Sequence, residues 1–380
     1  MTEPTARRTP GPTRSGEPAF DPERYARHLP IPGFGEEGQR KLAGASVLMV
    51  GAGGLGSPVG FYLAAVGVGK LTVVDDDRVD LTNLQRQVIH RAEDVGRPKV
   101  ESAASFVAAL NPDVSVTVRQ ERITPDTAED LLAGHDVILD GADNFPTRYA
   151  VSDAATALGI PVVWAAVLRF DAQLSTFVPG RPGAVGLRDL FPLPPRPEDV
   201  PSCAEAGVLG ALVGQVGSIM AAEVVKLVCG FGEPLVDRVL LVDALTQRTR
   251  EVPLRPVGDL GPPPAHEPVR ELVPLPERSV EDVRDALGGA GAPLLLDVRE
   301  PGEHALGIVP GALTVPVGEV LTWEQLDLLP DRPVVVYCKT GPRARRAAAH
   351  LVRLGHEDVS VMTGGMLAWI ERVEPSLPAY

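Results

Sequence analysis

ASVLMVGAGGLGSPVGFYLAAVGVGKLTVVDDD, residues 45–77, is the stretch that decides the fold of this chain. It starts with the continuous apolar run VLMV, which is typical of a strand buried on both faces. The glycine turn GAGGLG follows at once and leads into an apolar helix. A second apolar run, LTVV, ends on Asp75. Strand, glycine turn, helix and acid-ended strand together predict one mononucleotide-binding half of an α/β fold.

The glycines of this turn predict a phosphate site. Gly51 and Gly53 let backbone N–H groups approach a ligand, and the N-terminus of the following helix favours an anion. The Asp75 carboxylate, at the end of the second strand, can accept hydrogen bonds from ribose hydroxyls. An ordinary tight turn is the alternative, but it explains neither the helix nor the acid.

More charged residues follow other strand ends. We expect Arg86, Lys99 and Asp143 to join Asp75 at the carboxyl edge of the sheet, where open α/β sheets bind ligands. Two cations and two carboxylates suit ATP with a magnesium ion. The cations would bind the phosphates, Asp143 would lie near the metal and Asp75 would bind the ribose. GVGKL, residues 67–71, lacks the spacing of a Walker loop.

Composition and charge narrow the function classes. A chain of 380 residues should hold about two domains, and its net charge of −14 argues against a general nucleic-acid binder. Three cysteines favour the reducing cytoplasm, and the polar start indicates no signal peptide. Residues 207–230 are apolar enough for a membrane span, but Gln215, Glu223 and Lys226 favour a buried helix of a soluble protein.

The chain is predicted to contain two α/β domains. We expect a disordered tail at residues 1–19, then a Rossmann-like ATP-binding domain with a mixed sheet at residues 20–255. A Pro-rich linker, residues 256–276, leads to a small α/β domain at residues 277–380. In that domain the pattern predicts helices at residues 280–287, around 323–328 and at 343–355.

The first domain resembles the ubiquitin-activating-enzyme-like adenylyltransferases over about residues 25–254. The motifs are GAGGLGS, LTVVDDDRVDLTNLQRQ, GRPKVESA, DGADN and PSCAEAGVLG, and the molybdopterin-synthase and thiamine-pathway sulfurylases are the most similar members. The resemblance implies adenylation of the C-terminal glycine carboxylate of a small β-grasp protein. It implies ATP and magnesium binding, with Asp143 as the metal ligand, by Gly51, Gly53, Gly54, Asp75, Thr82, Asn83, Arg86, Lys99, Asp143 and Asn144. It also implies a homodimer in which Arg27 reaches the phosphates of the other subunit.

Cys203 lies in a long Pro-rich segment, residues 179–206, just before the buried helix. The resemblance implies a thiol that forms a thioester or resolves an acyl disulfide, and a helix N-terminus would lower its pKa. A half-buried structural cysteine is the alternative. Many family members hold a structural zinc with two CxxC pairs. GLRD, residues 186–189, stands in the first place, so we expect no zinc and a loop that is held by other contacts or mobile.

The last cysteine marks a second reactive loop. Cys338 opens CKTGPR between an apolar strand and a helix, so backbone N–H groups, Lys339 and Arg343 can surround its sulfur. DVREPGEH, VPGA and CKTGPR resemble the rhodanese sulfurtransferases, which implies a persulfide on Cys338 and a loop closed by Arg343. A cysteine phosphatase and an inert cysteine are the alternatives. Cys229, which precedes Gly230, is predicted to be a core thiol.

Joined on one chain, the two domains predict one reaction sequence. ATP would activate the C-terminal carboxylate of a sulfur-carrier protein ending in Gly-Gly, and the Cys338 persulfide would convert it to a thiocarboxylate. The pathway would be that of molybdenum cofactor, thiamine, cysteine or a thio-modification, with thiosulfate or a cysteine desulfurase as sulfur donor. Two alternatives stay open: an NAD-dependent oxidoreductase with an accessory sulfurtransferase domain, and a non-catalytic scaffold that presents the carrier.

Overall fold

A computed structural model describes residues 20–193, 207–257, 275–289, 291–326, 329 and 332–378. The described chain divides into two compact units, one built from residues 20–193 and 207–257 and the other from residues 275–378. The predicted tail, Cys203 and most of the predicted linker lie outside the described residues.

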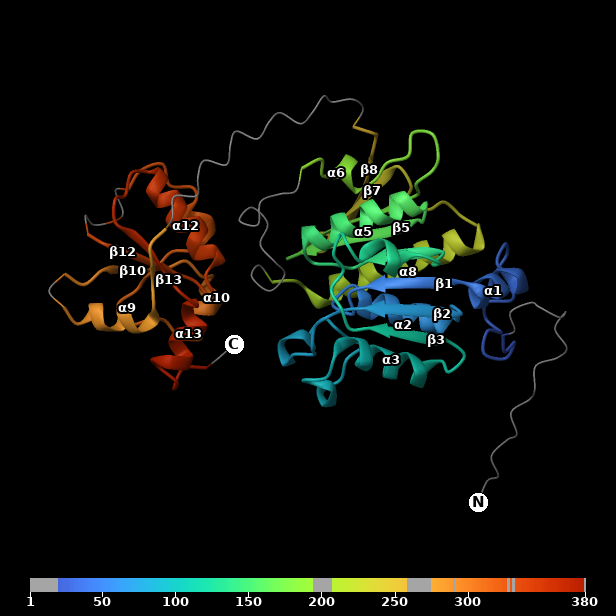
Figure 1. Cartoon of the computed structure of the whole chain (residues 1–380), viewed down its shortest axis with the longest axis horizontal. Helices are drawn as coiled ribbons and strands as arrows, with labels where there is room; N and C mark the ends of the chain where they lie inside the picture. Colours follow the sequence, from blue (N-terminus) through green and yellow to red (C-terminus); the bar gives the residue numbers. More distant parts are fainter. Residues whose placement is uncertain are drawn as a thin grey trace, which may run out of the picture. The chain divides into compact units, whose positions relative to one another are not determined.

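The first unit is built on one mixed sheet of eight strands, in the order β3-β2-β1-β4-β5-β6-β7-β8 (Figure 1). The strands from β3 to β5 are parallel, and those from β6 to β8 are antiparallel. This confirms the predicted α/β class and its mixed sheet. The strands are β1 (Ser46–Val50), β2 (Lys70–Val74), β3 (Ser115–Arg119), β4 (Val137–Asp140), β5 (Val162–Leu168), β6 (Asp171–Phe177), β7 (Arg238–Asp243) and β8 (Arg248–Pro253).

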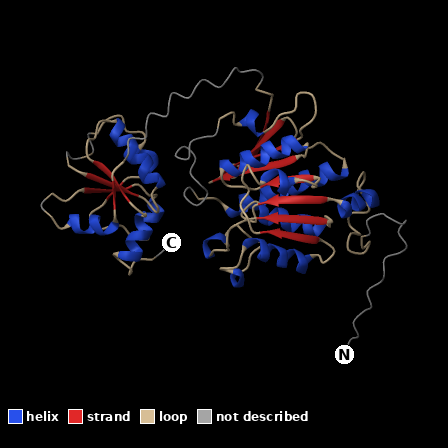
Figure 2. Ribbon diagram, viewed as in Figure 1, coloured by secondary structure: helices blue, strands red, loops and turns tan. Residues whose placement is uncertain are grey.

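Helices cover both faces of this sheet, so the unit has three layers (Figure 2). One core joins α2, α3 and α8 to the sheet, and a second core joins α4 and α5 to its other face. The helices are α1 (Gly35–Gly44), α2 (Gly56–Val66), α3 (Lys99–Leu110), α4 (Ala128–Leu132), α5 (Phe145–Leu158), α6 (Leu187–Leu190) and α8 (Gly210–Cys229), with 3-10 turns η1 (Leu81–Asn83) and η2 (Ala92–Asp94).

The glycine turn lies where the strand order reverses. β2 pairs with one edge of β1 and β4 pairs with the other, so the chain passes outward from β1 to β3 on one side and returns to β4 on the other. Gly51 has φ of 84°, and a Cβ on Gly56 would lie 1.9 Å from the Gly51 carbonyl oxygen. Only glycine fits this close approach, which starts α2 directly beyond β1. Such a switch point is where open α/β sheets bind ligands.

The apolar helix α8 is a core element of the first unit. By length and composition it is the one described helix that could cross a membrane, but half of its most apolar window is buried inside the protein. It packs against α1, α2 and strands β5 and β6. Glu223 on this helix is 1% exposed and accepts hydrogen bonds from Thr176 Oγ1 and the Leu235 N–H. The packing matches the predicted buried helix.

The second unit has a five-stranded parallel sheet in the order β11-β10-β12-β13-β9. Helices α11 and α12 pack in the core on one face, and α9 and α13 in the core on the other. Its elements are β9 (Glu277–Arg278), α9 (Val280–Leu287), β10 (Leu294–Asp297), α10 (Pro301–His304), β11 (Leu313–Thr314), α11 (Val317–Val320), β12 (Val334–Tyr337), α12 (Pro342–Arg353), β13 (Val359–Met362) and α13 (Gly365–Arg372).

One helix prediction in this unit is wrong. The helix expected around residues 323–328 is absent from its described part, and α11 lies earlier instead. Pro316 precedes α11, where its fixed φ favours the start of a helix. Trp323 and Leu326 nevertheless pack on the core from non-helical backbone. Apolar spacing alone therefore indicated burial correctly and secondary structure incorrectly.

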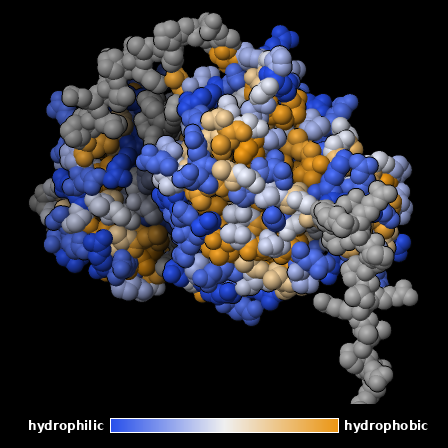
Figure 3. Space-filling model, turned by 45° about the vertical axis from the view of Figure 1, so that its right-hand side comes forward, coloured by the Kyte–Doolittle hydropathy of each residue, from blue (hydrophilic) through white to orange (hydrophobic). Residues whose placement is uncertain are grey.

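The surface of the protein mixes polar and apolar side chains, as Figure 3 shows for one face. Exposed large apolar residues of the first unit are scattered over several elements, for example Tyr62 on α2, Leu81 on η1 and Leu245 after β7. Apolar side chains that are exposed singly are usual on soluble domains.

Candidate functional site

The glycine turn is held in place by the acid that ends its neighbouring strand. Asp75 Oδ2 accepts a hydrogen bond from the Ala52 N–H at 2.8 Å, and Oδ1 accepts one from the Asp77 N–H at 2.8 Å. Burial raises the pKa of Asp75, and the nearby Lys99 ammonium opposes that shift. Among the described residues, the N-terminus of α2 has no side-chain cap. Within its first turn the Ser57 N–H donates to the Gly53 carbonyl at 3.0 Å and Pro58 has no N–H, so the Gly56 N–H and the helix dipole are what this end offers a phosphate.

The two predicted cations come to the same edge of the sheet. Lys99 begins α3 with its side chain 8% exposed, and its Nζ lies 2.7 Å from Asp77 Oδ2. Arg86 donates from Nη1 to the Thr82 carbonyl at 3.1 Å, and a Cβ placed on Gly54 would lie 3.8 Å from its Cδ. The cations therefore lie beside the glycine turn, where phosphates would meet them.

The 3-10 turn η1 positions the polar residues between these cations. Asp80 accepts hydrogen bonds from both the N–H and the hydroxyl of Thr82. Asn83 Oδ1 accepts the Asp80 N–H at 3.2 Å, which completes a reciprocal cap. Thr82 is exposed and Asn83 half-buried. Both side chains therefore keep accessible surface for the predicted nucleotide contacts while η1 stays folded.

The DGADN turn follows β4 on the other side of β1. Asp143 is exposed, and Asn144 caps α5 by accepting the Thr147 N–H at 3.0 Å. Asp140 is 1% exposed and accepts the Ala142 N–H at 3.0 Å; burial raises its pKa to about 6, against the opposing charge of Arg148. Asp140 therefore shapes the turn, while Asp143 is the carboxylate that faces solvent.

A buried histidine beneath the turn was missed by sequence reasoning. His90 is 5% exposed; its Nε2 lies 2.8 Å from the Ala52 carbonyl oxygen and its Nδ1 lies 2.8 Å from Ser102 Oγ on α3. Burial lowers the pKa of His90, which favours the neutral ring. The histidine thus ties the glycine turn to the helix that carries Lys99. The only signal was its place at the end of the polar segment VDLTNLQRQVIH.

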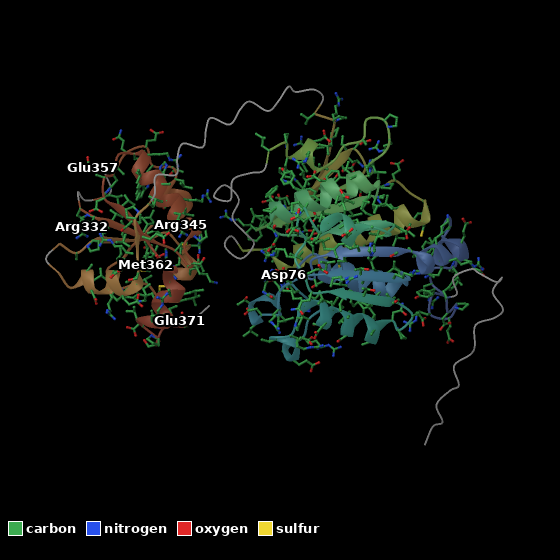
Figure 4. The ribbon with its side chains drawn as sticks, viewed as in Figure 1. Asp76, Arg332, Arg345, Glu357, Met362 and Glu371 are labelled. Atoms are coloured by element: carbon green, nitrogen blue, oxygen red, sulfur yellow. The ribbon has the colours of Figure 1, made fainter. Side chains whose placement is uncertain are left out.

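One group of described carboxylates is close enough for a metal ion. Oxygens of Asp75, Asp76 and Asp77 lie within 4.8 Å of one another. Asp76 marks the edge at which β2 ends (Figure 4) and pairs with Arg122 at 2.9 Å. Two of the three acids are thus already paired with cations, since Asp77 binds Lys99. Asp143, the predicted magnesium ligand, does not belong to this group.

The crossover segment before Cys203 is fastened by a carboxylate. The sequence indicated no regular structure there, but it contains α6. Asp189 Oδ2 accepts the Gly186 N–H at 2.8 Å and Oδ1 accepts the Val257 N–H at 2.8 Å, which joins this segment to the chain beyond β8. Arg188 also pairs with Asp153 on α5. The described part of this segment is therefore held by contacts with other residues. This is one of the two outcomes predicted from the sequence, the other being a mobile loop.

We expect Asp189→Ala to destabilise the first unit. The change leaves two backbone N–H groups without their acceptor, which costs about 1–2 kcal/mol of unfolding free energy. Calorimetry of the full chain measures this loss. Asp153→Ala is the matched control, because it removes an ion pair whose side chains are 49% and 55% exposed and should cost under about 1 kcal/mol. Equal losses in the two variants would contradict the fastening role.

The second unit presents Cys338 at the end of β12, in the loop that leads to α12. The residue is 1% exposed, and the Gly341 N–H points at its Sγ from 3.1 Å. The start of α13 packs on this loop: the Met366 N–H donates to the Cys338 carbonyl at 2.8 Å, and a Cβ on Gly365 would lie 2.3 Å from that oxygen. Arg345 on α12 and Met362 at the end of β13 locate this part of the sheet in Figure 4.

Arg343, which was predicted to close the loop, binds a partner that sequence reasoning did not identify. Its guanidinium binds Glu303 on α10 with two bonds, Nη1–Oε2 at 2.5 Å and Nη2–Oε1 at 2.8 Å, and the arginine is 5% exposed. Burial acts to raise the pKa of Glu303, but the hydrogen bonds from Arg343 outweigh it and hold that pKa below its usual value. Because a buried arginine needs a carboxylate partner, the acids of REPGEH were the available signal.

We expect Glu303→Gln to cost about 2 kcal/mol of unfolding free energy at neutral pH, since it leaves a buried guanidinium without its counter-charge. The depressed pKa of Glu303 means that this stabilisation is present above the unfolded-state pKa of about 4.3 and is lost as the pH falls through the folded-state pKa. Calorimetry of the full chain across this window should therefore show that the wild type loses unfolding free energy on acidification and that E303Q does not show this loss.

Glu277→Gln is the control for this pair, because it breaks an exposed ion pair with Arg345 and should leave the unfolding free energy nearly unchanged. If E303Q loses as much unfolding free energy on acidification as the wild type, the effect comes from other carboxylates.

Cys229 is a core thiol, as predicted. It is 5% exposed at the end of α8, with Sγ 3.5 Å from the Gly38 carbonyl, and burial raises its pKa to about 11. It and Cys338 are both free thiols. Of these two, Cys338 alone has a backbone N–H, that of Gly341, directed at its Sγ.

Comparison with protein families divides the chain in the same way. The ThiF family matches residues 25–259, and the rhodanese-like domain matches residues 279–372.

Two relatives match this chain over nearly its whole length, and a third matches most of its first unit. The probable adenylyltransferase/sulfurtransferase MoeZ of Mycobacterium tuberculosis is 41% identical, over 94% of this chain and 95% of that protein. The adenylyltransferase and sulfurtransferase MOCS3 of Bos taurus is 37% identical, over 98% and 90%. The SAMP-activating enzyme E1 of Haloferax volcanii is 50% identical over 61% of this chain and 85% of its own length. The crystal structure of E. coli MccB with ATP covers 63% of this chain and 74% of its own at a TM-score of 0.53 and 23% identity, which supports the fold alone.

Proposed function

The chain belongs to the ThiF family, continues into a rhodanese-like domain and is an adenylyltransferase/sulfurtransferase; from this premise we propose that it converts the C-terminal carboxylate of a ubiquitin-like sulfur carrier into a thiocarboxylate. The observation that carries the proposal is the presence, on one chain, of a glycine turn with Lys99 and Arg86 beside it and of a loop in which the Gly341 N–H points at the Cys338 sulfur. The relatives favour this function over an NAD-dependent oxidoreductase.

Adenylation comes first, because a free carboxylate is a poor electrophile. A carboxylate oxygen of the terminal glycine attacks the α-phosphorus of ATP, an acyl-adenylate forms, and pyrophosphate leaves. Arg86 and Lys99 stabilise the charge on the phosphates, and Asp75 orients the ribose. The uncapped N-terminus of α2 and the exposed Asp143 suit a nucleotide with its magnesium ion, which would neutralise phosphate charge.

Sulfur transfer follows. The terminal sulfur of a Cys338 persulfide attacks the acyl carbon, AMP leaves, and an acyl disulfide joins the carrier to Cys338. A thiol, either Cys203 or an external one, then attacks the Cys338 sulfur. This step forms a new disulfide at Cys338 and releases the thiocarboxylate, and a second thiol reduces the disulfide. Thiosulfate or a cysteine desulfurase would restore the persulfide, and the free thiols at Cys229 and Cys338 support a cytoplasmic setting.

We also propose that the enzyme is a homodimer in which Arg27 completes the nucleotide site of the partner subunit. Arg27 is exposed, so its guanidinium is available to another chain. The backbone beside it is fixed by Tyr25, which is 3% exposed and whose hydroxyl accepts a hydrogen bond from Asn111 at 2.8 Å. An exposed arginine on an anchored segment is suited to a contact in trans.

Two assays test the function with the full chain. ATP–pyrophosphate exchange that depends on a Gly-Gly-ended β-grasp carrier tests adenylation. Mass spectrometry of the carrier after incubation with ATP and thiosulfate tests exchange of oxygen for sulfur. Exchange without sulfur incorporation would limit the function to adenylation, and NAD binding without exchange would overturn it.

A further inference from the structure

Gln87 lies against the glycine turn and is not among the residues assigned above. It is 4% exposed, and its Nε2 lies 3.6 Å from the position that a Cβ on Gly53 would occupy. Its backbone is fixed at both ends: its N–H donates to the Asn83 carbonyl at 3.0 Å, and its carbonyl accepts the His90 N–H at 3.1 Å. The carboxamide is therefore held beside the turn by a short, hydrogen-bonded segment.

The Oε1 atom of this carboxamide is buried without a hydrogen-bond donor anywhere in the described chain. A buried acceptor without a partner costs about 1–3 kcal/mol, so such atoms in native proteins call for an explanation. Phosphate oxygens would not supply one, because they are acceptors themselves. The missing partner must carry an N–H or O–H group.

The two proposed substrates bring three kinds of donor: the ribose hydroxyls and the adenine amino group of ATP, and the peptide N–H groups of the carrier tail. Arg86, which precedes Gln87, lies near Gly54, whose Cβ position would also be 3.1 Å from Val213 of α8. Asp75, the proposed acceptor for ribose hydroxyls, ends β2 on the opposite side of β1 from β4. The ribose thus has its acceptor, and the adenine amino group lies at the end of ATP away from the phosphates, whereas Gln87 lies beside the glycine turn proposed to bind them. The peptide N–H groups next to the reacting carboxylate have no acceptor assigned so far.

We propose that Gln87 Oε1 accepts a hydrogen bond from the backbone N–H of the carrier's terminal glycine. This inference rests on the proposed function and deepens it, because it assigns a residue that recognises the acyl substrate rather than the nucleotide. The bond orients the terminal carboxylate beside the glycine turn, where the α-phosphate would lie. Gln87 is therefore a substrate-binding residue with a specific donor.

Pyrophosphate exchange with the full chain tests this contact. Gln87→Leu keeps the side-chain size but removes the acceptor, so the KM for a Gly-Gly-ended carrier should rise about tenfold while the KM for ATP changes less than about twofold. Gln120→Leu, on the exposed loop after β3, is the matched control and should behave like the wild type. A carrier whose terminal glycine is replaced by sarcosine lacks the donor N–H. With the wild type this replacement should raise the carrier KM about tenfold, and with Q87L it should raise the KM no further.

Three results would each overturn the contact: an equal effect of sarcosine on the wild type and Q87L, a rise in the KM of Q87L for ATP, or an unchanged KM of Q87L for the carrier. Gln87→Glu retains a polar isostere if Q87L unfolds, and its charge should raise the carrier KM further by repelling the carboxylate. Failure of the wild type to exchange with any carrier would overturn the proposed function as well, whereas wild-type exchange with indifferent variants would overturn this inference alone.

Discussion

Cys338→Ala abolishes sulfur transfer, with a loss of at least about a thousandfold, because no other described thiol lies in a loop that could hold a persulfide. ATP–pyrophosphate exchange with the carrier should remain at the wild-type rate, since the adenylation site lies in the other unit. Mass spectrometry of the carrier, together with thiosulfate-dependent sulfur transfer to cyanide, measures the loss.

Cys229→Ala is the matched control. This thiol is buried in the first unit with its pKa raised to about 11, so it is not a thiolate at neutral pH and should leave both activities intact. Thiocarboxylate formation by C338A at the wild-type rate would contradict the proposed reaction sequence.

We expect Lys99→Gln to reduce pyrophosphate exchange about a hundredfold or more, because it removes the positive charge that we propose to bind the triphosphate, on a side chain that is only 8% exposed. The fold should survive: the Asp77 carboxylate that loses its partner is 60% exposed and can be hydrated. Sulfur transfer from thiosulfate to cyanide, which we propose for the other unit, should be unchanged.

Lys41→Gln is the corresponding control, since Lys41 forms a surface pair with Glu37 and lies on α1. If K99Q and K41Q exchange pyrophosphate equally well, the cation beside Asp77 has no part in adenylation.

Local sequence patterns predicted the elements of the nucleotide site well. The apolar runs on either side of GAGGLG correspond to β1 and β2, and Gly56 occupies a position where a Cβ does not fit. Because parallel strands place their carboxyl ends at one edge of the sheet, the residue pattern alone was enough to assign Asp75 and Asp143 to that edge. These inferences worked because strand periodicity and glycine requirements are properties of short segments.

Contacts between distant segments could not be predicted in this way. Arg343 and Glu303 are 40 residues apart, and Asp189 and the Val257 N–H are 68 apart. His90 reaches the Ala52 carbonyl through packing of η1, α3 and the glycine turn. Hydrophobic periodicity indicates which face of an element is buried, but it does not specify which polar groups meet once the faces have packed.

The hydrogen bond between Asp189 and the Val257 N–H also fixes one end of the chain segment that joins the two units. Residues 258–274 connect Val257 to the second unit, and a fully extended chain of that length spans at most roughly 60 Å. The chain is therefore held to the first unit as far as Val257, and this length of connecting chain is counted from that residue rather than from the end of β8. A longer connecting segment would lower the effective concentration of the Cys338 persulfide near the activated carrier. Cutting the segment would make their encounter depend on the enzyme concentration.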